Sequence, residues 1–336
     1  MMEKRKLGRT GLEVTSLGFG ALPIQRCDMQ EAGEVLNAAL DSGINFVDTA
    51  RAYTDSEEKI GASIAGRRKE FILASKSLQR TYEGMAADID KSLKLMKTGY
   101  IDLYQVHNVK RREELETVLA PGGALEALQA AKVAGKIGHI GFTGHSIELL
   151  IEAISTGNFA TVQVPFNIVE TGALERLFPL AKEMDIGRIV MKPLGGGLLP
   201  LKNLALRYIL ENDVTVAIPG MDKIEHVTQN VAAVQPFVPL SKEERAELTR
   251  EAELIGKDFC RRCGYCLPCT QGIDIPTTFI FHHQYRNYGM KDIIPGRYAA
   301  FPAKASDCIE CGVCETRCPY DIPIMKRMKK IAEDLG

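Results

Sequence analysis

Two cysteine runs in the last quarter of the chain have the spacing of iron-sulfur ligands. Eight of the nine cysteines lie in these runs. The second run, CIECGVCETRCP, has the CxxCxxCxxxCP form of bacterial ferredoxins, in which three thiolates hold one cluster and the fourth holds another. The first run, CRRCGYCLPC, has one residue fewer before its last cysteine. The candidate metal ligands are Cys260, Cys263, Cys266 and Cys269, followed by Cys308, Cys311, Cys314 and Cys318.

This spacing predicts two [4Fe-4S] clusters, with two zinc sites as the alternative. Zinc ribbons use separated CxxC pairs, and neither run has that form. The shortened first run leaves the fourth ligand of each cluster open. By analogy with two-cluster ferredoxins, the expected sets are Cys260, Cys263, Cys266 and Cys318 for one cluster, and Cys308, Cys311, Cys314 and Cys269 for the other. Cys27 stands apart, and we expect cluster content not to depend on it.

A second group of polar residues follows apolar runs in the first third of the chain. Asp48 and Tyr53 lie in NFVDTARAY, Lys76 follows ILAS, and His107 follows DLYQV. Tyr53 can donate a proton to a developing alkoxide if the Lys76 ammonium favours its phenolate. Asp48 would keep Lys76 charged, and His107 would orient and polarise a carbonyl oxygen. Taken singly, each residue has an ordinary structural explanation, but together they predict acid catalysis of carbonyl reduction, typically worth about 10² to 10⁴ in rate.

These residues need a scaffold that brings several strand ends to one place. Before residue 258, eight β-rich runs alternate with helical patterns. The strict alternation predicts an α/β fold, a (β/α)8 TIM barrel, whose chemistry gathers at the C-terminal ends of the strands. An open doubly wound sheet is the alternative, but no glycine-rich dinucleotide turn follows the first strand. The predicted strands begin at Thr15, Asn45, Glu70, Tyr100, Ile137, Thr161, Gly187 and Val214.

Helix signals divide the chain into three parts. Capping-box pairs mark two helix starts, Asp28 with Glu31 and Ser241 with Glu244. We therefore expect a barrel domain over residues 1–238, a connecting helix over 239–258 and a small α-helical ferredoxin-like domain with two [4Fe-4S] clusters over 259–336. In that last part, the adjacent His282 and His283 are interpreted as residues of a helix rather than metal ligands.

The composition excludes several classes of protein. The chain has 336 residues, of which 45% are apolar and 25% charged, and a formal net charge of −1. These values are typical of a soluble globular protein with one large and one small domain. The near-neutral charge gives no field that would attract nucleic acid or an anionic membrane. No signal peptide or membrane-spanning run is found, so we expect a cytoplasmic protein that binds neither nucleic acid nor membrane.

From Leu7 to about Val234 the sequence resembles the aldo/keto reductase superfamily. The motifs NFVDTARAY, ILASK and DLYQVHN place Asp48, Tyr53, Lys76 and His107 at the positions of the family's catalytic tetrad. With its cysteine-rich tail, the chain resembles the subgroup that carries a C-terminal double [4Fe-4S] ferredoxin-type domain. The resemblance implies a TIM barrel and an NAD(P)-dependent oxidoreductase.

The resemblance also implies a nicotinamide nucleotide site. The carboxamide-binding pair aligns with Gly144 and His145 or with His145 and Ser146. The remaining implied residues are Gln163, Lys192, Gly195, Gly196, Gly197, Gly220, Lys223, His226 and Asn230. Many NADP-using members stack an aromatic residue on the nicotinamide where this chain has Met191 and Lys192, and place Lys, Ser and Arg against the 2′-phosphate where it has Gly220, Met221 and His226. We therefore expect NADH to be used at least comparably to NADPH.

Two functions are compatible with the sequence. The first is an oxidoreductase that transfers hydride between a nicotinamide nucleotide and a small-molecule carbonyl or alcohol substrate, with clusters for electron transfer or structure. The alternative is an iron-sulfur electron-transfer protein whose barrel binds a partner or a non-nicotinamide cofactor. The basic run Lys326, Arg327, Lys329 and Lys330 could dock an acidic electron partner, such as a ferredoxin or flavoprotein, or form a solvated face. Each cluster passes one electron, so direct exchange with a nicotinamide would require a two-electron converter such as a flavin.

Overall fold

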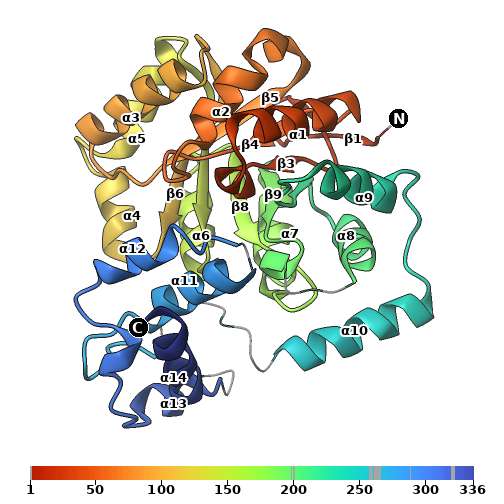
Figure 1. The fold of residues 1–336 in the computed structure, drawn as a ribbon. Coiled ribbons are helices and arrows are strands. Elements are labelled where there is room, and N and C mark those ends of the chain that lie inside the picture. Colours follow the sequence, from red (N-terminus) through yellow and green to blue (C-terminus); the bar gives the residue numbers. More distant parts are fainter. Residues whose placement is uncertain are drawn as a thin grey trace. The chain divides into compact units, whose positions relative to one another are not determined.

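The chain folds into two compact units. The computed structural model describes residues 2–197, 199, 201–256, 260, 266–287, 289–318 and 322–336 (Figure 1). The first unit comprises Met1–Gly196 and Leu201–Leu248, and the second comprises Gly197–Pro200 and Thr249–Gly336. Apart from the short stretch Gly197–Pro200, the boundary between the two units therefore falls between residues 248 and 249.

The first unit is a parallel (β/α)8 barrel. Its eight strands pair in chain order from β3 to β10. Backbone hydrogen bonds then join the first strand to the last: Gly18 N donates to Ala217 O over 2.8 Å, and Gly20 N donates to Pro219 O over 2.9 Å. The ring of strands is therefore closed. The predicted TIM barrel is confirmed, and an open sheet is excluded.

Strands and helices lie close to their predicted positions (Figure 1). The barrel strands are β3 (Phe19–Gly20), β4 (Phe46–Asp48), β5 (Ile72–Ser77), β6 (Ile101–Val109), β7 (Ile137–Gly144), β8 (Thr161–Pro165), β9 (Gly187–Met191) and β10 (Val216–Ile218). The helices of this unit are α1 (Met29–Asp41), α2 (Ser56–Ser63), α3 (Tyr82–Leu95), α4 (Arg112–Leu119), α5 (Ala124–Val133), α6 (Ile147–Ser155), α7 (Leu177–Glu183), α8 (Lys202–Leu210) and α9 (Ile224–Val234). The alternation rule does not anticipate α4, which shares the β6–β7 connection with α5.

An N-terminal hairpin precedes the barrel. Strand β1 (Lys4–Lys6) pairs antiparallel with β2 (Glu13–Thr15). Leu7 and Val14 pack with Phe46 inside the barrel. The predicted start of the first barrel strand at Thr15 is wrong, because Thr15 belongs to the hairpin. The apolar run continues through the connection to β3, so periodicity alone does not show where one strand ends and the next begins.

A polar layer stands above the apolar layer inside the barrel. Phe46 on β4 and Ala74 on β5 belong to the apolar core. Two residues further along the same strands stand Asp48 and Lys76, and successive side chains on a strand point to opposite faces. These two residues therefore point into the barrel, as Gln105 does on β6. All three are buried. The strands thus carry charged groups into the interior near their C-terminal ends.

Both predicted capping boxes are confirmed. Asp28 Oδ1 accepts from Glu31 N and Glu31 Oε2 accepts from Asp28 N, each over 2.8 Å, at the start of α1. At helix α10 (Lys242–Gly256), Ser241 Oγ accepts from Glu244 N over 3.2 Å and Glu244 Oε2 accepts from Ser241 N over 2.8 Å. Each reciprocal pair satisfies backbone N–H groups that the first helical turn leaves without partners.

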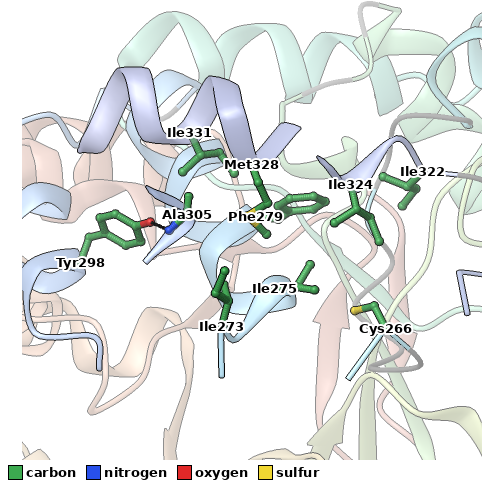
Figure 2. Close-up of a cluster of buried hydrophobic side chains, with 10 residues drawn as sticks. All are labelled: Cys266, Ile273, Ile275, Phe279, Tyr298, Ala305, Ile322, Ile324, Met328 and Ile331. Carbon is green, nitrogen blue, oxygen red and sulfur yellow. Dashed lines mark hydrogen bonds between the residues drawn. The ribbon is translucent and has the colours of Figure 1, made fainter. Parts of the chain in front are cut away.

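The second unit is a small helical domain. Its helices are α11 (Ile275–Asn287), α12 (Ile294–Ala299), α13 (Val313–Thr316) and α14 (Ile324–Leu335). Figure 2 shows side chains from α11, α12, α14 and the intervening loops gathered in one core. The members of this core are Cys266, Ile273, Ile275, Phe279, Tyr298, Ala305, Ile322, Ile324, Met328 and Ile331.

Polar contacts to one carboxylate join α11 to α14. His282 Nε2 lies 2.7 Å from Asp334 Oδ2, and Arg286 Nε lies 2.8 Å from the same oxygen. The hydrogen bond from His282 lowers the pKa of Asp334 to about 2. His282 therefore lies on a helix, as expected, with its Nε2 directed to a carboxylate.

Among the helices in the described ranges, none has the length and apolar character needed to cross a bilayer.

Candidate active site and cluster-binding cysteines

An ion pair between Asp48 and Lys76 forms the centre of the candidate active site. Lys76 Nζ donates to Asp48 Oδ1 over 2.6 Å and to the backbone oxygen of Thr49 over 2.7 Å. The side chains are only 1% (Lys76) and 3% (Asp48) exposed. Burial alone would lower the pKa of Lys76, but the Asp48 carboxylate outweighs it, so this pKa is raised. The ammonium therefore stays charged at neutral pH.

Two glutamines extend this polar layer. Gln105 Nε2 donates to Gln163 Oε1 over 3.0 Å and lies 3.3 Å from Asp48 Oδ2. Gln163 is one of the residues that the family resemblance implies for the nucleotide, and its buried side chain contacts this network. Gln105 is not among the residues predicted from the sequence. The available signal is that Gln105 interrupts an apolar run two residues before His107, which puts both on the same side of β6.

Tyr53 lies beside the ion pair, in the loop between β4 and α2. Lys76 Nζ is 5.0 Å from the centre of the Tyr53 ring. The ring meets the His107 imidazole edge-on, with centroids 5.9 Å apart. Burial raises the pKa of Tyr53, and the Lys76 ammonium opposes this shift without reversing it. The Lys76 ammonium acts to lower the pKa of Tyr53, as expected, but burial raises this pKa by more. The phenol is therefore protonated at neutral pH.

A buried network behind the barrel wall holds the Tyr53 loop. Arg51, in that loop, pairs with Glu57 in the first turn of α2. Glu57 Oε1 also accepts from Ser75 Oγ over 2.6 Å and from Ser92 Oγ over 2.8 Å. The sequence analysis identifies none of these residues. They connect the loop to β5 and α3, and so restrict where Tyr53 can lie.

His107 completes the group as a neutral imidazole. Burial lowers its pKa well below the ordinary value, and the cations Lys76 and Arg80 add to the shift. Its Nδ1 is buried, and the described residues offer that nitrogen no hydrogen-bond partner. Arg80 Nη2 donates to the backbone oxygen of His107 over 2.8 Å. The structure thus groups the four predicted catalytic residues around one ion pair.

A second hydrogen-bonded chain links three strand ends. His145 Nδ1 lies 2.9 Å from Asn108 Oδ1, and Lys192 Nζ lies 2.9 Å from His145 Nε2. An ammonium can only donate, so Nε2 accepts from Lys192 and Nδ1–H donates to Asn108. We assign this neutral tautomer from the hydrogen bonds. His145 and Lys192 are among the residues implied by the resemblance, whereas Asn108 is not.

Asn108 and Lys192, at the two ends of this series of hydrogen bonds, have unusual backbone conformations. Asn108 has φ 53° and Lys192 has φ 55°, in the left-handed region. Such a conformation costs a non-glycine residue about 1–3 kcal/mol and is often found at functional sites. Asn167 Nδ2 donates to Lys192 O over 3.1 Å and helps to hold it. Lys192 is therefore fixed at both its backbone and its ammonium.

The glycine run has the backbone needed for close approach of an anion. Gly195, Gly196 and Gly197 have φ of 58°, 71° and 90°. Without Cβ atoms, these residues leave their amides unscreened. Two further residues that the resemblance implies for the nucleotide, Gly144 and Ser146, make contacts that belong to the barrel itself. Gly144 ends β7, opposite Val109 of β6, and Ser146 Oγ accepts from Leu149 N over 3.3 Å as the cap of α6.

An acidic residue that the sequence analysis misses lies beyond the last strand. Asp222 pairs with Arg26 Nη2 at 2.5 Å and with His226 Nδ1 at 2.8 Å. Its side chain is 13% exposed. His226, which the resemblance implies at the nucleotide, is thus next to a carboxylate. A 2′-phosphate placed here would meet this carboxylate together with the Arg26 guanidinium that pairs with it.

The other residues that the resemblance implies beyond the last strand differ in how far they are buried. Lys223 is exposed just before α9, whereas Asn230 is buried within that helix. Gly220 lies against the β3–α1 connection, where an added Cβ would stand 2.5 Å from Pro23 Cγ. A glycine is therefore required at position 220 for packing alone.

Cysteines from both runs line one largely apolar cavity in the second unit. The cavity is also lined by Ile275, Ile324 and Met328. Thiolates are the ligands of a [4Fe-4S] cluster, but among the described residues no group of three or more Cys, His, Asp or Glu side chains is already close enough together to hold a metal ion. The lining cysteines are Cys269 from the first run and Cys308, Cys311 and Cys314 from the second, the set that the spacing of two-cluster ferredoxins predicts for one cluster.

Three of the four cysteines expected at the other cluster lie in or against the same core. Cys266 is buried in it, and Cys260 and Cys318 pack against it. Cys263 lies outside the described residues. Cys27 belongs to the first unit, where burial raises the pKa of its thiol to about 11 and its Sγ contacts Asp222 O at 3.3 Å. Its thiol therefore contacts the barrel unit and not the described part of the cysteine runs.

Comparison with known proteins gives the family of each part. Residues 16–204 match the aldo/keto reductase family, and residues 259–323 match a 4Fe-4S dicluster domain. The aldo-keto reductase YhdN of Bacillus subtilis (strain 168) is 32% identical over 231 residues, which cover 63% of this chain and 68% of that protein. L-Galactose dehydrogenase of Arabidopsis thaliana is 27% identical over 305 residues, covering 76% of this chain and 94% of that protein.

Solved structures agree with these matches. The holo form of aldo-keto reductase AKR11C1 from Bacillus halodurans aligns with a TM-score of 0.67 at 27% identity, covering 75% of this chain and 96% of that one. An aldo/keto reductase from Klebsiella pneumoniae in complex with NADP and acetate aligns with a TM-score of 0.62 at 26% identity, covering 74% and 95%. The chain belongs to the aldo/keto reductase family. It is an oxidoreductase of that family with a C-terminal 4Fe-4S dicluster domain.

Proposed function

We propose that the protein transfers hydride between a nicotinamide nucleotide and a small-molecule carbonyl or alcohol substrate. The observation that carries this proposal is the Asp48–Lys76 ion pair with Tyr53 and a neutral His107 beside it. Tyr53 is the proton donor to the substrate oxygen. Lys76, held charged by Asp48, stabilises the phenolate that Tyr53 becomes when it gives up its proton. Neutral His107 hydrogen-bonds the same oxygen and orients it.

The residues that follow the C-terminal ends of the barrel strands fit a nucleotide site. The left-handed run Gly195–Gly197 can present amides to a pyrophosphate. We assign nucleotide binding to these glycines together with Gly144, His145, Ser146, Gln163, Lys192, Gly220, Lys223, His226 and Asn230. The related Klebsiella pneumoniae enzyme, solved in complex with NADP, supports a nucleotide here. A bound nucleotide supplies or accepts the hydride.

The test of this proposal is Tyr53→Phe. We expect nucleotide-dependent turnover of a screened carbonyl substrate to fall by at least about 10²-fold, the usual range for a general acid. Tyr100→Phe is the matched control, because Tyr100 lies directly before β6, at the end of the strand opposite His107. A wild-type protein that binds neither NADH nor NADPH, and whose activity survives Tyr53→Phe, would instead support the electron-transfer alternative.

We further propose that NADH is used at least comparably to NADPH. Asp222 is the reason, since its carboxylate would repel a 2′-phosphate and holds the Arg26 guanidinium in an ion pair. Asp222→Ser should raise kcat/KM for NADPH relative to NADH by roughly tenfold, the change for about 1.4 kcal/mol. Glu225→Ser removes an exposed charge from the first turn of α9 and is the matched control. An unchanged ratio in Asp222→Ser would remove Asp222 from this role.

In the second unit, we propose two [4Fe-4S] clusters with the ligand sets expected from the spacing. The cavity lined by Cys269, Cys308, Cys311 and Cys314 supports one of these sets. The clusters supply one-electron transfer or cross-links when bound. Protein purified without oxygen should carry about eight irons per chain. Stoichiometric zinc without iron, in protein made under iron-replete anaerobic conditions, would contradict this. An acidic ferredoxin or flavoprotein is the electron partner that the basic helix α14 would accept.

A further inference from the structure

Lys192 is a cation whose ammonium is held by a neutral partner. Its Nζ contacts the Nε2 of His145, and the tautomer of His145 is fixed in turn by Asn108. Lys76 differs, because its charge is opposed by Asp48 at 2.6 Å. A hydrogen bond to an imidazole positions an ammonium without cancelling its charge. The field of Lys192 therefore acts on any group bound next to it.

The chain of contacts places this charge close to the reacting residues. Asn108 directly follows His107 on β6, His145 directly follows β7, and Lys192 directly follows β9. The Lys192–His145 hydrogen bond thus passes the end of β8, the strand that carries Gln163. A hydride donor that serves a carbonyl at His107 must present its ring at these strand ends. Lys192 is then among the charges nearest to that ring.

We propose that Lys192 acts as a fixed positive charge beside the nicotinamide and makes the protein bind the reduced nucleotide more tightly than the oxidised one. This inference rests on the proposed function. The oxidised ring carries a positive charge and the reduced ring is neutral, so the ammonium repels only the oxidised form. At a separation of about 6 Å and an effective dielectric constant near 20, the repulsion corresponds to roughly a hundredfold difference in Kd.

The charge also sets the direction in which the bound nucleotide reacts more readily. A tenfold difference between the two Kd values raises the two-electron potential of the bound nucleotide by about 30 mV. The bound oxidised form is then a stronger oxidant than the free one. The favoured reaction moves a hydride from the carbinol carbon of an alcohol to the ring. The hydroxyl proton passes to the Tyr53 oxygen, which has first released its own proton to solvent, and a carbonyl is left.

The experiment measures equilibrium binding and needs no substrate. Kd values for NAD⁺ and NADH are measured by calorimetry on the full chain with its clusters intact. In Lys192→Met and Lys192→Gln, the ratio Kd(NAD⁺)/Kd(NADH) should fall by at least about tenfold, chiefly because NAD⁺ binds more tightly. Lys192→Arg keeps the charge and should keep the ratio. Lys110→Met, which removes an exposed cation two residues beyond Asn108, is the matched control.

The possible failures differ from one another. If wild-type protein binds neither form, the proposed function fails and the inference fails with it. If both forms bind and the neutral variants weaken both equally, Lys192 contacts a part of the nucleotide that is common to the two forms, and the inference alone is wrong. A ratio that falls as far in Lys192→Arg as in Lys192→Met also overturns it, because the charge would then not be the cause.

Discussion

The barrel site and the cysteine cavity are organised in different ways. In the barrel, polar groups of the site bind one another across neighbouring strands, as Lys76 does with Asp48 and Gln105 with Gln163. These contacts lie next to an apolar layer inside the ring of strands. In the second unit, four cysteines surround a cavity, and its core of buried residues is small. A small core rarely stabilises a domain without metals or disulfides.

This difference indicates what each part needs in order to hold its shape. The barrel places its reactive residues through protein contacts alone, so a bound nucleotide meets a preformed site. The second unit brings cysteines from two runs together, and bonds to iron would connect those runs. The first part is therefore expected to keep its geometry without cofactor, and the second is expected to depend on its clusters.

Removal of iron is the strongest test of this comparison. Anaerobic chelation should leave the amide protection of barrel strands β4 to β9 unchanged and should abolish most of the protection in α11 and α14. Hydrogen exchange followed by mass spectrometry on loaded and chelated protein measures both regions in one sample. Equal protection of α11 and α14 before and after chelation would show that the small core suffices.

Removal of one charge in the barrel tests the other half of this comparison, that contacts between protein groups position the reactive residues. Lys76→Met leaves the Asp48 carboxylate buried without its cation, and loss of one partner of a buried pair typically costs about 3–5 kcal/mol. Activity should fall by at least about 10²-fold, because the phenolate of Tyr53 loses its stabilising charge. Chemical denaturation and steady-state kinetics measure the two effects.

The double variant Asp48→Asn/Lys76→Met separates stability from catalysis. It removes both charges, so the free energy of unfolding should recover by more than half while activity stays low. If activity recovered together with stability, the ion pair would be structural and Lys76 would have no role in the proton transfer.

Much of the barrel could be predicted from the sequence because its pattern is repetitive. Eight strands separated by helical stripes leave few arrangements, and the strand at Ile137–Gly144 lies where the sequence places it. The hairpin β1–β2 and helix α4 could not be predicted in the same way. They do not belong to the repeat, and their apolar residues are indistinguishable from those of the neighbouring elements.

The sequence points to site residues where a polar side chain stands out against an apolar background. Asp48, Lys76 and His107 each end a buried run, and the structure groups them as expected. Gln105, Asn108 and Asp222 were missed because their roles depend on partners far away in the sequence. Asn108 matters through His145, 37 residues later, and no local spacing encodes such a contact. The net pKa shift of Tyr53 also depends on burial, which the sequence does not quantify.

The smallest expected effect concerns a hydrogen bond to one cysteine of the cavity. Thr270 Oγ1 lies 3.4 Å from Cys311 Sγ. A hydroxyl donated to a cluster thiolate stabilises the more negative, reduced state, so Thr270→Val should lower the reduction potential. If the bond contributes about 0.5–1.5 kcal/mol, the shift is roughly 20 to 60 mV for one electron. Thr316→Val is the matched control, since its hydroxyl donates to the backbone oxygen of Val313 instead. A redox titration followed by electron paramagnetic resonance measures the potentials, and equal shifts in the two variants would show that the Thr270 hydroxyl does not bind the cluster sulfur.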